Sequence, residues 1–497
     1  ITAGAIRAKE KIAIFGDYDV DGITSTAIRV KFFRELGADV IWHLPDRERE
    51  GYGVNEAAVR DFAAKGAGLM ITVDCGITAS REALIARELG MRTVITDHHQ
   101  PGRDLPQADA VVNPNQRGDS SGLGNLAGVG VAFMFLAALN RVMGHPVMDM
   151  MKFMDLVALG TICDTMPLTG LNRAIAASGL KVLDRTLNCG LKALMESTGV
   201  RRADVYAAGF MLGPRLNAAG RITDAGLALD LLLTDNSLMA ADLVSRLNEM
   251  NAKRQSIQNA IMIDADGQAQ KQSGKFCIFA AGHGWHGGVM GIVAGRLREK
   301  YGVPCCVATI SGGVVNGSGR SVSGVDLGRI IRDALEAGLI TAGGGHAAAA
   351  GFDLAASGSE KFAVFLEERV KLQLGGSRQK PRLATDIGMD AGGATVELCA
   401  KLSQLEPFGM GNPEPVLALS GGIWTFAKTI GNGSHFSGNL KTASGNLAVV
   451  GFGMSGTPVG KFLLDEANRG AKIRLAGRLK MNDRFGGVQF LLEDAAV

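Results

Sequence analysis

The sequence predicts an α/β protein of several domains: a doubly wound parallel sheet, a long connecting helix, a second α/β unit and a small C-terminal β-barrel. Short apolar runs alternate with helical patterns over residues 11–165, an amphipathic pattern continues from Asn236 to about Lys271, and short strand-like segments follow from about residue 415. Strand–helix alternation is typical of parallel sheets, whereas closely spaced strands with turn signals are typical of barrels. A chain of 497 residues is long enough for three or four domains.

The first unit, residues 1–195, has its strands predicted by apolar runs. These runs are Ile12–Phe15, Val40–Leu44, Leu69–Val73, Thr93–Thr96, Ala110–Asn113 and Leu156–Ile162. A helical pattern from Ile23 to Leu36 follows the first run, and residues 170–233 are predicted to be mostly helical.

A helical connector is predicted at residues 196–272, and the amphipathic pattern forms its last part. Apolar residues recur there at helical spacing, namely Leu243, Leu247, Met250, Ile257 and Ile261. A spacer between domains and a core helix of either neighbour both fit this pattern.

The second α/β unit, residues 273–376, begins with apolar runs at Phe276–Ala280 and Cys305–Ile310. Gly375-Gly376-Ser377 and Lys380-Pro381 predict a linker after it. The last domain, residues 377–497, contains the short strands Ile423–Thr429, Phe436–Lys441, Leu447–Phe452, Ile473–Lys480 and Val488–Leu492. This pattern predicts a barrel that is OB-like in size.

Composition excludes several classes of protein. The net charge of +3 is too small to indicate nucleic-acid binding, so any basic surface must be local. The apolar run Val129–Leu139 is too short for a membrane span. Seven cysteines without a CxxC spacing predict neither structural zinc nor disulfides, which favours a reducing cytoplasm. Because the chain begins with Ile, we expect an N-terminal segment to precede it.

Three carboxylates at alternate positions, Asp17, Asp19 and Asp21, directly follow the first predicted strand. Such carboxylates repel one another unless a divalent cation lies between them. An EF-hand requires Glu at position 12 of the loop, and counting from Asp17 that position is Ile28. A catalytic metal site and a plain acidic turn that caps the next helix are the remaining alternatives.

Three further predicted strand ends carry ligand-type residues: Asp74-Cys75-Gly76, Asp97-His98-His99 and Asp164. Strand ends converge at one edge of a doubly wound sheet, which favours the metal site. The predicted ligands are Asp17, Asp19, Asp74, His98 and Asp164. Carboxylates mixed with imidazole suit Mn²⁺ or Mg²⁺ better than zinc. One carboxylate that bridges two ions gives the geometry used for phosphoester hydrolysis.

Two segments have the composition of phosphate-binding sites. Arg215, Asn217 and Arg221 lie close together between glycines and a proline, and guanidinium groups suit bidentate phosphate contacts; pairing with Asp224 is the alternative for the arginines. Ser318, Arg320 and Ser321 combine small residues, backbone amides and one cation.

A third segment, Gly343-Gly344-Gly345-His346, is predicted to open an Ala-rich helix whose N-terminus favours an anion. A flexible turn is the alternative. The segment Gly122–Ala127 fits a loose dinucleotide fingerprint, but no strand precedes it and no acidic partner follows, so we reject that interpretation. The chain contains no Walker-type motif that would predict ATP binding.

Basic and aromatic residues alternate along the predicted barrel. The basic ones are Lys428, Lys441, Lys472, Arg474, Arg478, Lys480 and Arg484. The aromatic and imidazole side chains are Trp424, Phe426, His435, Phe436 and Phe485. Phosphate attraction combined with base stacking suits single-stranded nucleic acid. A barrel core with a solvated polar face is the alternative.

These motifs resemble a known family. GDYDVDG (16–22), VDCG (73–76), TDHH (96–99) and the Asp of GTICDTMPL (160–168) resemble, in order and setting, the motifs of the DHH phosphoesterases. GPRLNAAGR (213–221), HGGVMGIVA (286–294), GSGRS (317–321) and GGH (344–346) resemble the RecJ family of single-stranded-DNA exonucleases. The resemblance extends over essentially the whole chain. Some relatives carry a His shortly before the first Asp, and residues 12–16 offer none, so we expect one metal to be held more weakly.

The resemblance implies a DHH catalytic domain, a DHH-associated domain and an OB-like domain. It implies a two-ion 5′-to-3′ exonuclease that hydrolyses single-stranded DNA to mononucleotides in repair and recombination. His99 would contact the phosphate or protonate the leaving oxygen, and Asp97 is the second catalytic candidate. The resemblance adds His286, Gly344, Gly345 and His346 to the substrate-binding set.

The partners implied are single-stranded DNA, helicase and single-strand-binding protein, without a membrane, and the expected state is a monomer. One alternative is a DHH phosphoesterase that acts on short oligonucleotides or cyclic dinucleotides. The other is a non-catalytic scaffold that binds single strands.

Overall fold

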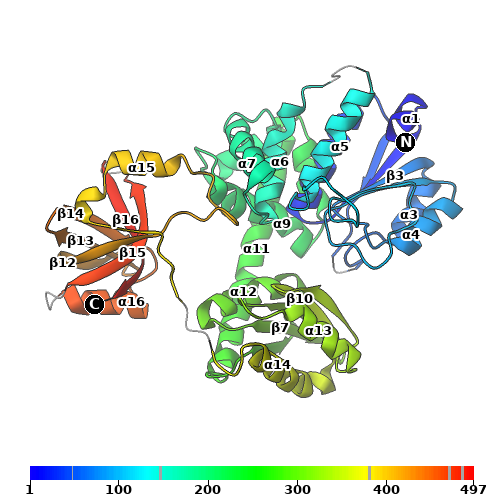
Figure 1. Ribbon diagram of the computed structural model, residues 1–497. Coiled ribbons are helices and arrows are strands. Elements are labelled where there is room, and N and C mark those ends of the chain that lie inside the picture. The colour runs from blue at the N-terminus through cyan, green and yellow to red at the C-terminus, as the bar shows by residue number, and fades with distance from the viewer. Residues whose placement is uncertain (48, 145–147, 379–381, 468–471, 483–485, 497) are drawn as a thin grey trace. The chain divides into compact units, whose positions relative to one another are not determined.

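The computed structural model describes residues 1–47, 49–144, 148–378, 382–467, 472–482 and 486–496. The chain divides into two compact units, Ile1–Lys380 and Pro381–Val497 (Figure 1). Among the described residues, every helix is too short or too polar to span a lipid bilayer.

The first unit begins with a five-stranded sheet in the order β2-β1-β3-β4-β5, in which all neighbours are parallel. Its strands are β1 (Lys11–Phe15), β2 (Val40–His43), β3 (Ala67–Val73), β4 (Arg92–Thr96) and β5 (Ala110–Val112). The reversal of strand order at β1 and β3 confirms the predicted doubly wound sheet.

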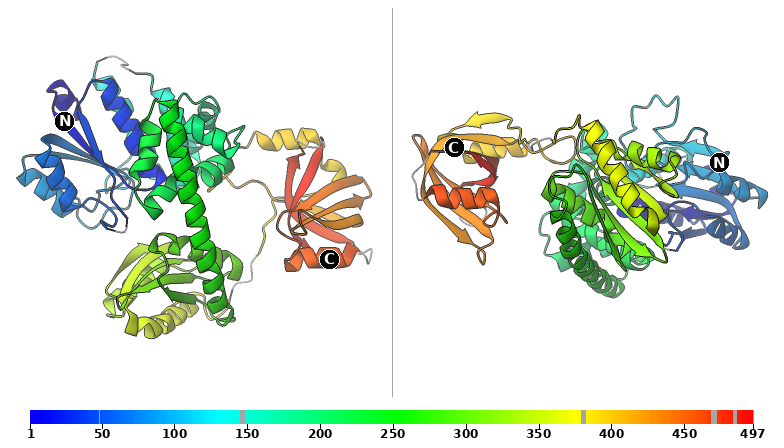
Figure 2. Two further views of the ribbon diagram at one scale, coloured as in Figure 1. Left: turned by 180° about the vertical axis from the view of Figure 1, so that it is seen from behind. Right: turned by 90° about the horizontal axis from the view of Figure 1, so that it is seen from below.

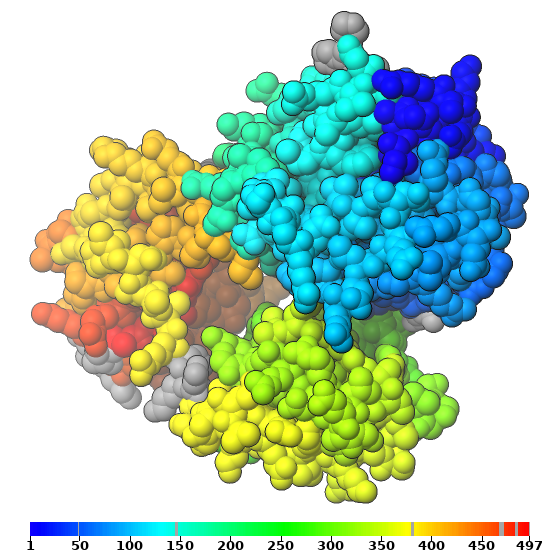
Figure 3. Space-filling view, turned by 45° about the vertical axis from the view of Figure 1, so that its right-hand side comes forward, coloured from blue at the N-terminus to red at the C-terminus, as the bar shows by residue number. Residues whose placement is uncertain are grey.

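Helices flank this sheet. They are α1 (Thr2–Arg7), α2 (Val20–Glu35), α3 (Glu56–Ala64), α4 (Ser80–Glu88) and α5 (Gly128–Val142). The short helix α1 lies on the surface beside α5, where Arg7 Nη2 donates a hydrogen bond to the Val142 carbonyl oxygen at 3.0 Å (Figure 3).

One predicted strand is wrong. Leu156–Ile162 belongs to the helix α6 (Met154–Cys163), which packs between α2, α5 and α7 (Gly170–Leu183). Every residue from Met154 to Ile162 is buried, so the helix has no polar face. A helix that is apolar on all sides has no 3.6-residue pattern, and a short apolar run then resembles a buried strand.

The region that follows α6 is helical, as predicted. Its elements are α7, α8 (Cys189–Thr198), the π-helix η2 (Ala207–Leu212), α9 (Gly213–Ile222), α10 (Gly226–Leu233) and α11 (Ser237–Gln270), with the short 3₁₀ turn η1 (Met150–Phe153) before α6.

The long helix α11 is confirmed, and the Asn236 side chain caps its first turn. Leu243 and Leu247 pack in the core of the first sheet and its helices, here called the first α/β layer. Ile261 and Ala265 pack in a separate core with residues 278–307, which belong to the second sheet and its helices, the second α/β layer. Figure 2 shows α11 leading from one layer to the other. The helix is therefore both a connector and a core element of each neighbour.

The second α/β layer has the strand order β6-β7-β8-β10-β9. Its strands are β6 (Ile278–His283), β7 (Cys305–Ser311), β8 (Val314–Arg320), β9 (Ala342–His346) and β10 (Ala349–Ala355). Its helices are the 3₁₀ turns η3 (Gly287–Val289) and η4 (Ala356–Gly358), with α12 (Met290–Tyr301), α13 (Leu327–Glu336) and α14 (Ser359–Gln373).

The helix predicted to open at Gly343–His346 is wrong, because this segment is the strand β9. It forms an antiparallel hairpin with β10, in which Gly344 faces Gly351 and Gly345 faces Ala350. Strand β10 is in turn paired with β8. Long-range pairing therefore overrides the helix propensity of the alanines that follow the glycines.

The C-terminal unit contains a β-barrel, as predicted. Its strands are β11 (Ile387–Met389), β12 (Leu417–Ile430), β13 (His435–Thr442), β14 (Gly445–Gly451), β15 (Ile473–Met481) and β16 (Val488–Ala496). Strand β12 pairs with both β13 and β15, which closes the barrel. The short helices η5 (Ala391–Gly393), α15 (Val396–Ser403) and α16 (Pro458–Ala467) complete the unit.

Candidate metal centre

The carboxyl ends of three parallel strands and the C-terminus of α6 bring all five predicted metal ligands together. Asp17 and Asp19 follow β1, Asp74 follows β3, His98 follows β4, and Asp164 is the C-cap of α6. Three groups have ligand atoms within 4.8 Å of one another: Asp17/Asp19/Asp74, Asp21/His98/Asp164 and Asp74/His98/His99. Asp74 belongs to two of these groups, which is the arrangement that a bridging carboxylate requires.

Glycines allow this convergence. At Gly128, the first residue of α5, a Cβ would lie 2.5 Å from Asp74 Oδ1. At Gly22 in the first turn of α2, a Cβ would lie 2.5 Å from the Asp17 carbonyl oxygen. Asp19 is the N-cap of α2, and its Oδ1 accepts a hydrogen bond from Gly22 N at 3.0 Å. Two helix N-termini therefore approach the carboxylates directly.

Asp21 is a member of the cluster that the predicted ligand set omits. Its side chain is buried, and its oxygens accept hydrogen bonds from Gly128 N at 2.6 Å and Val129 N at 2.8 Å. Asp21 Oδ2 also lies 3.8 Å from His98 Nε2. In the sequence, Asp21 continues the alternate spacing of Asp17 and Asp19, and this spacing could have identified it as a member of the cluster. Asp21 thus joins the N-terminus of α5 to the cluster, where the helix dipole favours a negative charge.

Two carboxylate oxygens fit a divalent cation particularly well. Asp74 Oδ1 and Asp164 Oδ2 are buried and accept no hydrogen bond from the described residues. They lie 3.1 Å and 3.7 Å from His98 Nε2. A buried carboxylate oxygen without a donor costs free energy, and a cation bound between these oxygens removes that cost. The set of oxygens with one imidazole is the donor chemistry of Mn²⁺ or Mg²⁺.

Burial and the mutual repulsion of the carboxylates shift the pKa values of the cluster. Burial, followed by repulsion from neighbouring carboxylates, raises the pKa of Asp21 to about 7 and that of Asp164 to about 9. The same causes raise the pKa values of Asp17 and Asp74 well above their usual range. Burial and the charge of His99 lower the pKa of His98 to about 4, which keeps its ring neutral and able to bind a metal.

Asp97 is placed to orient His99. Its Oδ2 accepts a hydrogen bond from Ile77 N at 2.9 Å, and its Oδ1 accepts from His98 N, His99 N and His99 Nδ1. Burial alone would raise the pKa of Asp97, but these hydrogen bonds lower it. Burial alone would lower the pKa of His99, but the hydrogen bond to Asp97 and nearby carboxylate charges raise it.

Tyr52 was not predicted. It lies in the loop between β2 and α3, and its hydroxyl is 3.2 Å from His99 Nδ1. The two rings meet edge to face with 5.8 Å between their centroids.

The predicted phosphate-binding residues of α9 have different surroundings. Arg215 donates hydrogen bonds to Asn248 Oδ1 at 2.7 Å and to the Met211 carbonyl oxygen at 2.6 Å. Asn217 Oδ1 accepts from Val20 N at 3.1 Å and so supports the loop after β1 that carries Asp17 and Asp19.

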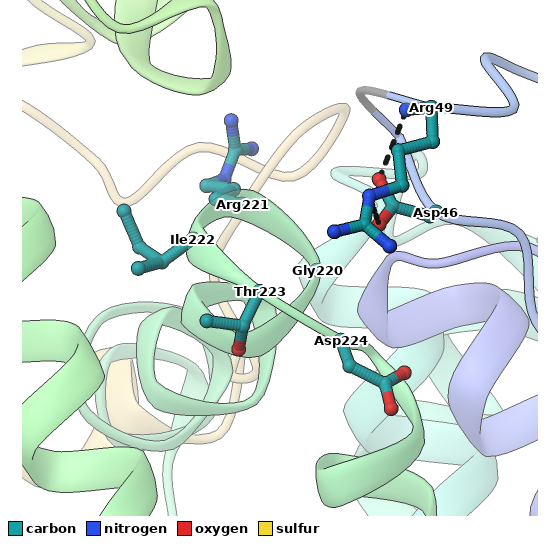
Figure 4. Close-up of a pocket in the computed structure, with 7 residues that line it drawn as sticks. All are labelled: Asp46, Arg49, Gly220, Arg221, Ile222, Thr223 and Asp224. Carbon is teal, nitrogen blue, oxygen red and sulfur yellow. Dashed lines mark hydrogen bonds and ion pairs between the residues drawn. The ribbon is translucent and has the colours of Figure 1, made fainter.

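Arg221 points toward the second α/β layer, where its Nη1 donates to the Gly288 carbonyl oxygen at 2.9 Å. The alternative pairing of Arg221 with Asp224 is not found among the described residues. Figure 4 shows the two side chains pointing apart around a pocket that is also lined by Asp46 and Arg49.

Arg47 is a further cation that the prediction missed. Its guanidinium lies 5.2 Å from the centre of the Tyr18 ring, which is part of the loop that carries Asp17 and Asp19. Burial, followed by the charges of Arg47 and Arg254, lowers the pKa of Arg221 to about 10. Burial and then Arg47 and Arg298 likewise lower the pKa of Arg320. The arginines therefore share a region of positive potential, which favours an anion.

The predicted residues of the second layer fall into two groups. Ser321 is buried and donates its hydroxyl to the Val325 carbonyl oxygen at 2.8 Å, which is a structural role. His286 Nδ1 accepts from Gly288 N at 3.1 Å, so His286 and Arg221 both contact Gly288. Arg320 donates to the Gly319 carbonyl oxygen, and a Cβ at Gly291 would lie 2.8 Å from its Nη2.

The remaining members of that set lie along paired strands. Gly344, Gly345 and His346 are exposed on β9, and Ser318 lies on β8 opposite Gly351 of β10. Gly345 has a φ of +146°, which other residues rarely adopt.

The predicted strand-binding residues of the barrel divide by burial. Trp424 and Phe436 are buried in the barrel core, as the alternative interpretation required. Phe426 is 48 % exposed, and Lys428 Nζ lies 6.0 Å from the centre of its ring. His435 contacts the exposed Phe452 edge to face.

The basic residues of the barrel differ in their surroundings, because some form ion pairs and others are exposed to solvent. Arg478 pairs with Glu493 at 2.8 Å, and Lys480 pairs with Glu414 at 2.7 Å. Lys441, Lys472 and Arg474 are exposed. Arg484 and Phe485 lie outside the described residues.

Comparisons with known proteins agree with these features. Residues 11–161 match the N-terminal domain of the DHH family, residues 273–372 the DHHA1 domain and residues 385–494 the RecJ OB domain. The chain is 36 % identical to the single-stranded-DNA-specific exonuclease RecJ of Bacillus subtilis, over 99 % of this chain and 62 % of that protein. It is 36 % identical to RecJ of Escherichia coli, over 84 % of this chain and 76 % of that protein.

Among solved structures, RecJ of Thermus thermophilus in complex with Mn²⁺ matches with a TM-score of 0.85 and 30 % identity. That match covers 99 % of this chain and 70 % of the solved one. The sequence identity over most of the length of the Escherichia coli relative, together with the DHH, DHHA1 and OB matches, shows that this chain belongs to the RecJ family.

Proposed function

We propose that this protein is a metal-dependent exonuclease that hydrolyses single-stranded DNA to mononucleotides from the 5′ end. The observation that carries the proposal is the cluster around Asp74, in which two buried carboxylate oxygens accept no hydrogen bond from described residues. The curated relatives are single-stranded-DNA-specific exonucleases. This chain spans 62 % of the length of the Bacillus subtilis relative, so the activity stands here as a proposal.

In this proposal Asp17, Asp19 and Asp74 would hold one cation, and Asp74, His98 and Asp164 would hold the second. When bound, such cations neutralise phosphate charge and lower the pKa of water, which supplies hydroxide for in-line attack. Asp21 holds the N-terminus of α5 against the cluster through Gly128 N and Val129 N.

His99 is the proposed proton donor of the reaction. Asp97 accepts its Nδ1 proton at 2.7 Å, which fixes the ring and leaves Nε2 to face the substrate. Because nearby carboxylates raise the pKa of His99, a protonated ring is available near neutral pH to donate from Nε2 to the leaving oxygen. Tyr52 covers the ring from the side of the β2–α3 loop.

The phosphates of the substrate are proposed to bind to arginine side chains. Arg47 and Arg221 lie next to the metal-binding loop, and Arg320 is proposed to bind the terminal 5′ phosphate with His286, Ser318, Gly344, Gly345 and His346. The barrel adds stacking and charge through Phe426 and Lys428. We include in the proposal a monomeric state, a cytoplasmic location, a role in repair and recombination, and cooperation with helicases and single-strand-binding protein.

The test is digestion of 3′-end-labelled single-stranded DNA, duplex DNA and RNA with Mn²⁺, Mg²⁺ or EDTA. The proposal expects single-stranded DNA to shorten progressively from its 5′ end in either metal, with no cleavage in EDTA. Cleavage confined to di- or trinucleotides would favour the alternative phosphoesterase. Tight strand binding without cleavage in any metal would favour the non-catalytic scaffold.

A further inference from the structure

Two large aromatic side chains lie exposed on the segment that packs against the turn carrying Asp164. Tyr206 is 64 % exposed and Phe210 is 69 % exposed. Their rings stack on each other, with centroids 5.3 Å apart and an interplanar angle of 19°. Exposed apolar surface of this kind commonly marks a binding site.

The backbone places the two side chains on one face of the same segment. Phe210 lies in the π-helix η2, and Tyr206 is the N-cap of that element. Side chains four residues apart lie on the same face of a helical segment, so the two rings are neighbours. Irregular turns of this kind occur often at functional sites.

The other side of η2 packs against the turn that carries Asp164. Cys163 Sγ donates to the Ala208 carbonyl oxygen at 3.5 Å. At Gly213, a Cβ would lie 2.5 Å from the same sulfur, so the Cys163 side chain packs closely against the backbone of Gly213. The aromatic pair therefore lies on the exposed side of a segment whose other side contacts the turn carrying Asp164.

The same segment continues into the predicted phosphate-binding helix. The π-helix η2 ends at Leu212, and α9 begins at Gly213 and carries Arg215, Asn217 and Arg221. Arg215 is bonded to a neutral amide and a carbonyl oxygen, so it retains its positive charge. Arg201 and Arg202 are exposed just before η2. Aromatic faces and unneutralised cations on one continuous segment match the chemistry of a strand of unpaired nucleotides.

We propose that Tyr206 and Phe210 form a base-stacking platform for the single strand beside the metal centre. An unpaired base packs on the open outer face of the pair while the neighbouring phosphates lie along α9. Bases within a duplex are already stacked and paired, so the platform selects single strands. This inference rests on the proposed function. It assigns a residue pair that distinguishes single strands from duplexes without distinguishing one base from another.

The test uses strands that carry 2-aminopurine at successive positions from the 5′ end, mixed with the full chain in EDTA so that no cleavage occurs. Stacking quenches the fluorescence of this base. We expect the wild type to quench it at one or two positions, and the double variant Tyr206→Ala/Phe210→Ala to lose that quenching. Stacking of one base corresponds to about a 5- to 150-fold weaker Kd for the variant.

Three controls separate stacking from other effects. A strand that is abasic at the quenched position should bind the wild type and the double variant equally. Tyr206→Phe should retain the quenching. Ile263→Ala, which removes a side chain that is 77 % exposed on α11, should leave both readouts unchanged. Because all three positions are exposed, each variant should keep the circular dichroism of the wild type.

Unchanged quenching and Kd in the double variant would overturn the inference. A shift from dimer to monomer in sedimentation, without a change in quenching, would also overturn it and identify the pair as a contact between copies of the chain. If the wild type neither binds nor cleaves single-stranded DNA, the proposed function itself fails. That result is distinct from a wild type that cleaves normally but does not stack the base.

Discussion

His99 Nδ1 lies 2.7 Å from Asp97 Oδ1, and the same oxygen accepts hydrogen bonds from the backbone N–H groups of His98 and His99. One buried carboxylate therefore fixes both the backbone of the HH pair and the ring of its second member. His98 is directed to the carboxylate cluster, and His99 is held with one nitrogen engaged. This relationship gives adjacent histidines different surroundings, which fits the proposal that His98 binds a metal and His99 donates a proton.

His99→Gln should lower kcat by about 10²–10⁴, the usual contribution of a general acid, with little effect on strand binding. Glutamine keeps an amide near Asp97 but cannot supply a titratable proton. Steady-state kinetics in Mn²⁺ and strand binding in EDTA measure the two effects. Asp119→Asn, at an exposed loop carboxylate, is the control and should behave as the wild type. A kcat within threefold of wild type for His99→Gln would exclude His99 as the general acid.

Asp97→Asn should move the alkaline limb of the kcat–pH profile to lower pH. The hydrogen bond and charge of Asp97 raise the pKa of His99, so their loss lowers that pKa, and the protonated ring disappears at a lower pH. The measurement is kcat from pH 5.5 to 9.5 at saturating Mn²⁺. An alkaline limb that stays in place while kcat falls uniformly would show that Asp97 acts only through folding.

The metal-free protein should lose stability as the pH rises. Folded-state pKa values of about 7 for Asp21 and about 9 for Asp164 lie above the unfolded value of about 3.9, so the folded state binds more protons between these limits. The free energy of unfolding therefore falls as the pH rises from about 4 toward 9.

Thermal unfolding in EDTA and in Mn²⁺ across this pH range tests the prediction. Mn²⁺ should neutralise the carboxylates and flatten the dependence, and Asp164→Asn should reduce it in EDTA. Parallel curves for EDTA and Mn²⁺ would mean that the cluster does not carry the effect.

Gly128→Ala should abolish activity, because the added Cβ would lie 2.5 Å from Asp74 Oδ1 and displace that carboxylate. Gly267→Ala is the matched control on α11, where a Cβ would meet no atom within 4 Å. The control should keep full activity and stabilise the protein by about 0.5–1 kcal/mol. Activity assays with Mn²⁺ binding and denaturant unfolding measure both variants. Full activity in Gly128→Ala would show that the close approach of α5 to Asp74 is not required.

Arg320→Ala should weaken the recognition of a 5′-phosphorylated end by roughly 1.5–3 kcal/mol, the value of a charge-assisted hydrogen bond. The KM for 5′-phosphorylated strands should rise more than the KM for 5′-hydroxyl strands. Arg329→Ala, at an exposed position on α13, is the control and should leave both unchanged. An equal loss on both substrates would make Arg320 a general contact to the strand.

The sequence predicted most of the first sheet because each strand is a short apolar run that ends in a polar turn, as at Phe15 and Val73. It failed at Leu156–Ile162, where burial on all sides removes the periodicity that distinguishes a helix from a strand. It failed again at Gly343–His346, whose strand pairing with Ala349–Ala355 depends on partners that local propensity does not report.

The candidate site shows the same division. The predicted ligands after β1, β3 and β4 lie together at one edge, because sheet topology determines where strand ends meet. Asp164 joins them from the end of the helix α6, where a strand was predicted. Asp21 was omitted although it belongs to the same loop, since its partners Gly128 and Val129 come from a distant helix. Tyr206 and Phe210 were not singled out, because their exposure and stacking depend on a π-helical turn that no sequence pattern predicts.

The number of Mn²⁺ ions bound per chain at equilibrium shows whether two cations share Asp74. Isothermal titration of the wild type should give two ions per chain. Asp74→Asn should bind at most one ion and release no mononucleotides from single-stranded DNA. Two results would show that Asp74 is not shared by two cations. One is a wild type that binds a single ion, and the other is an Asp74→Asn variant that binds two ions and hydrolyses the strand at the wild-type rate.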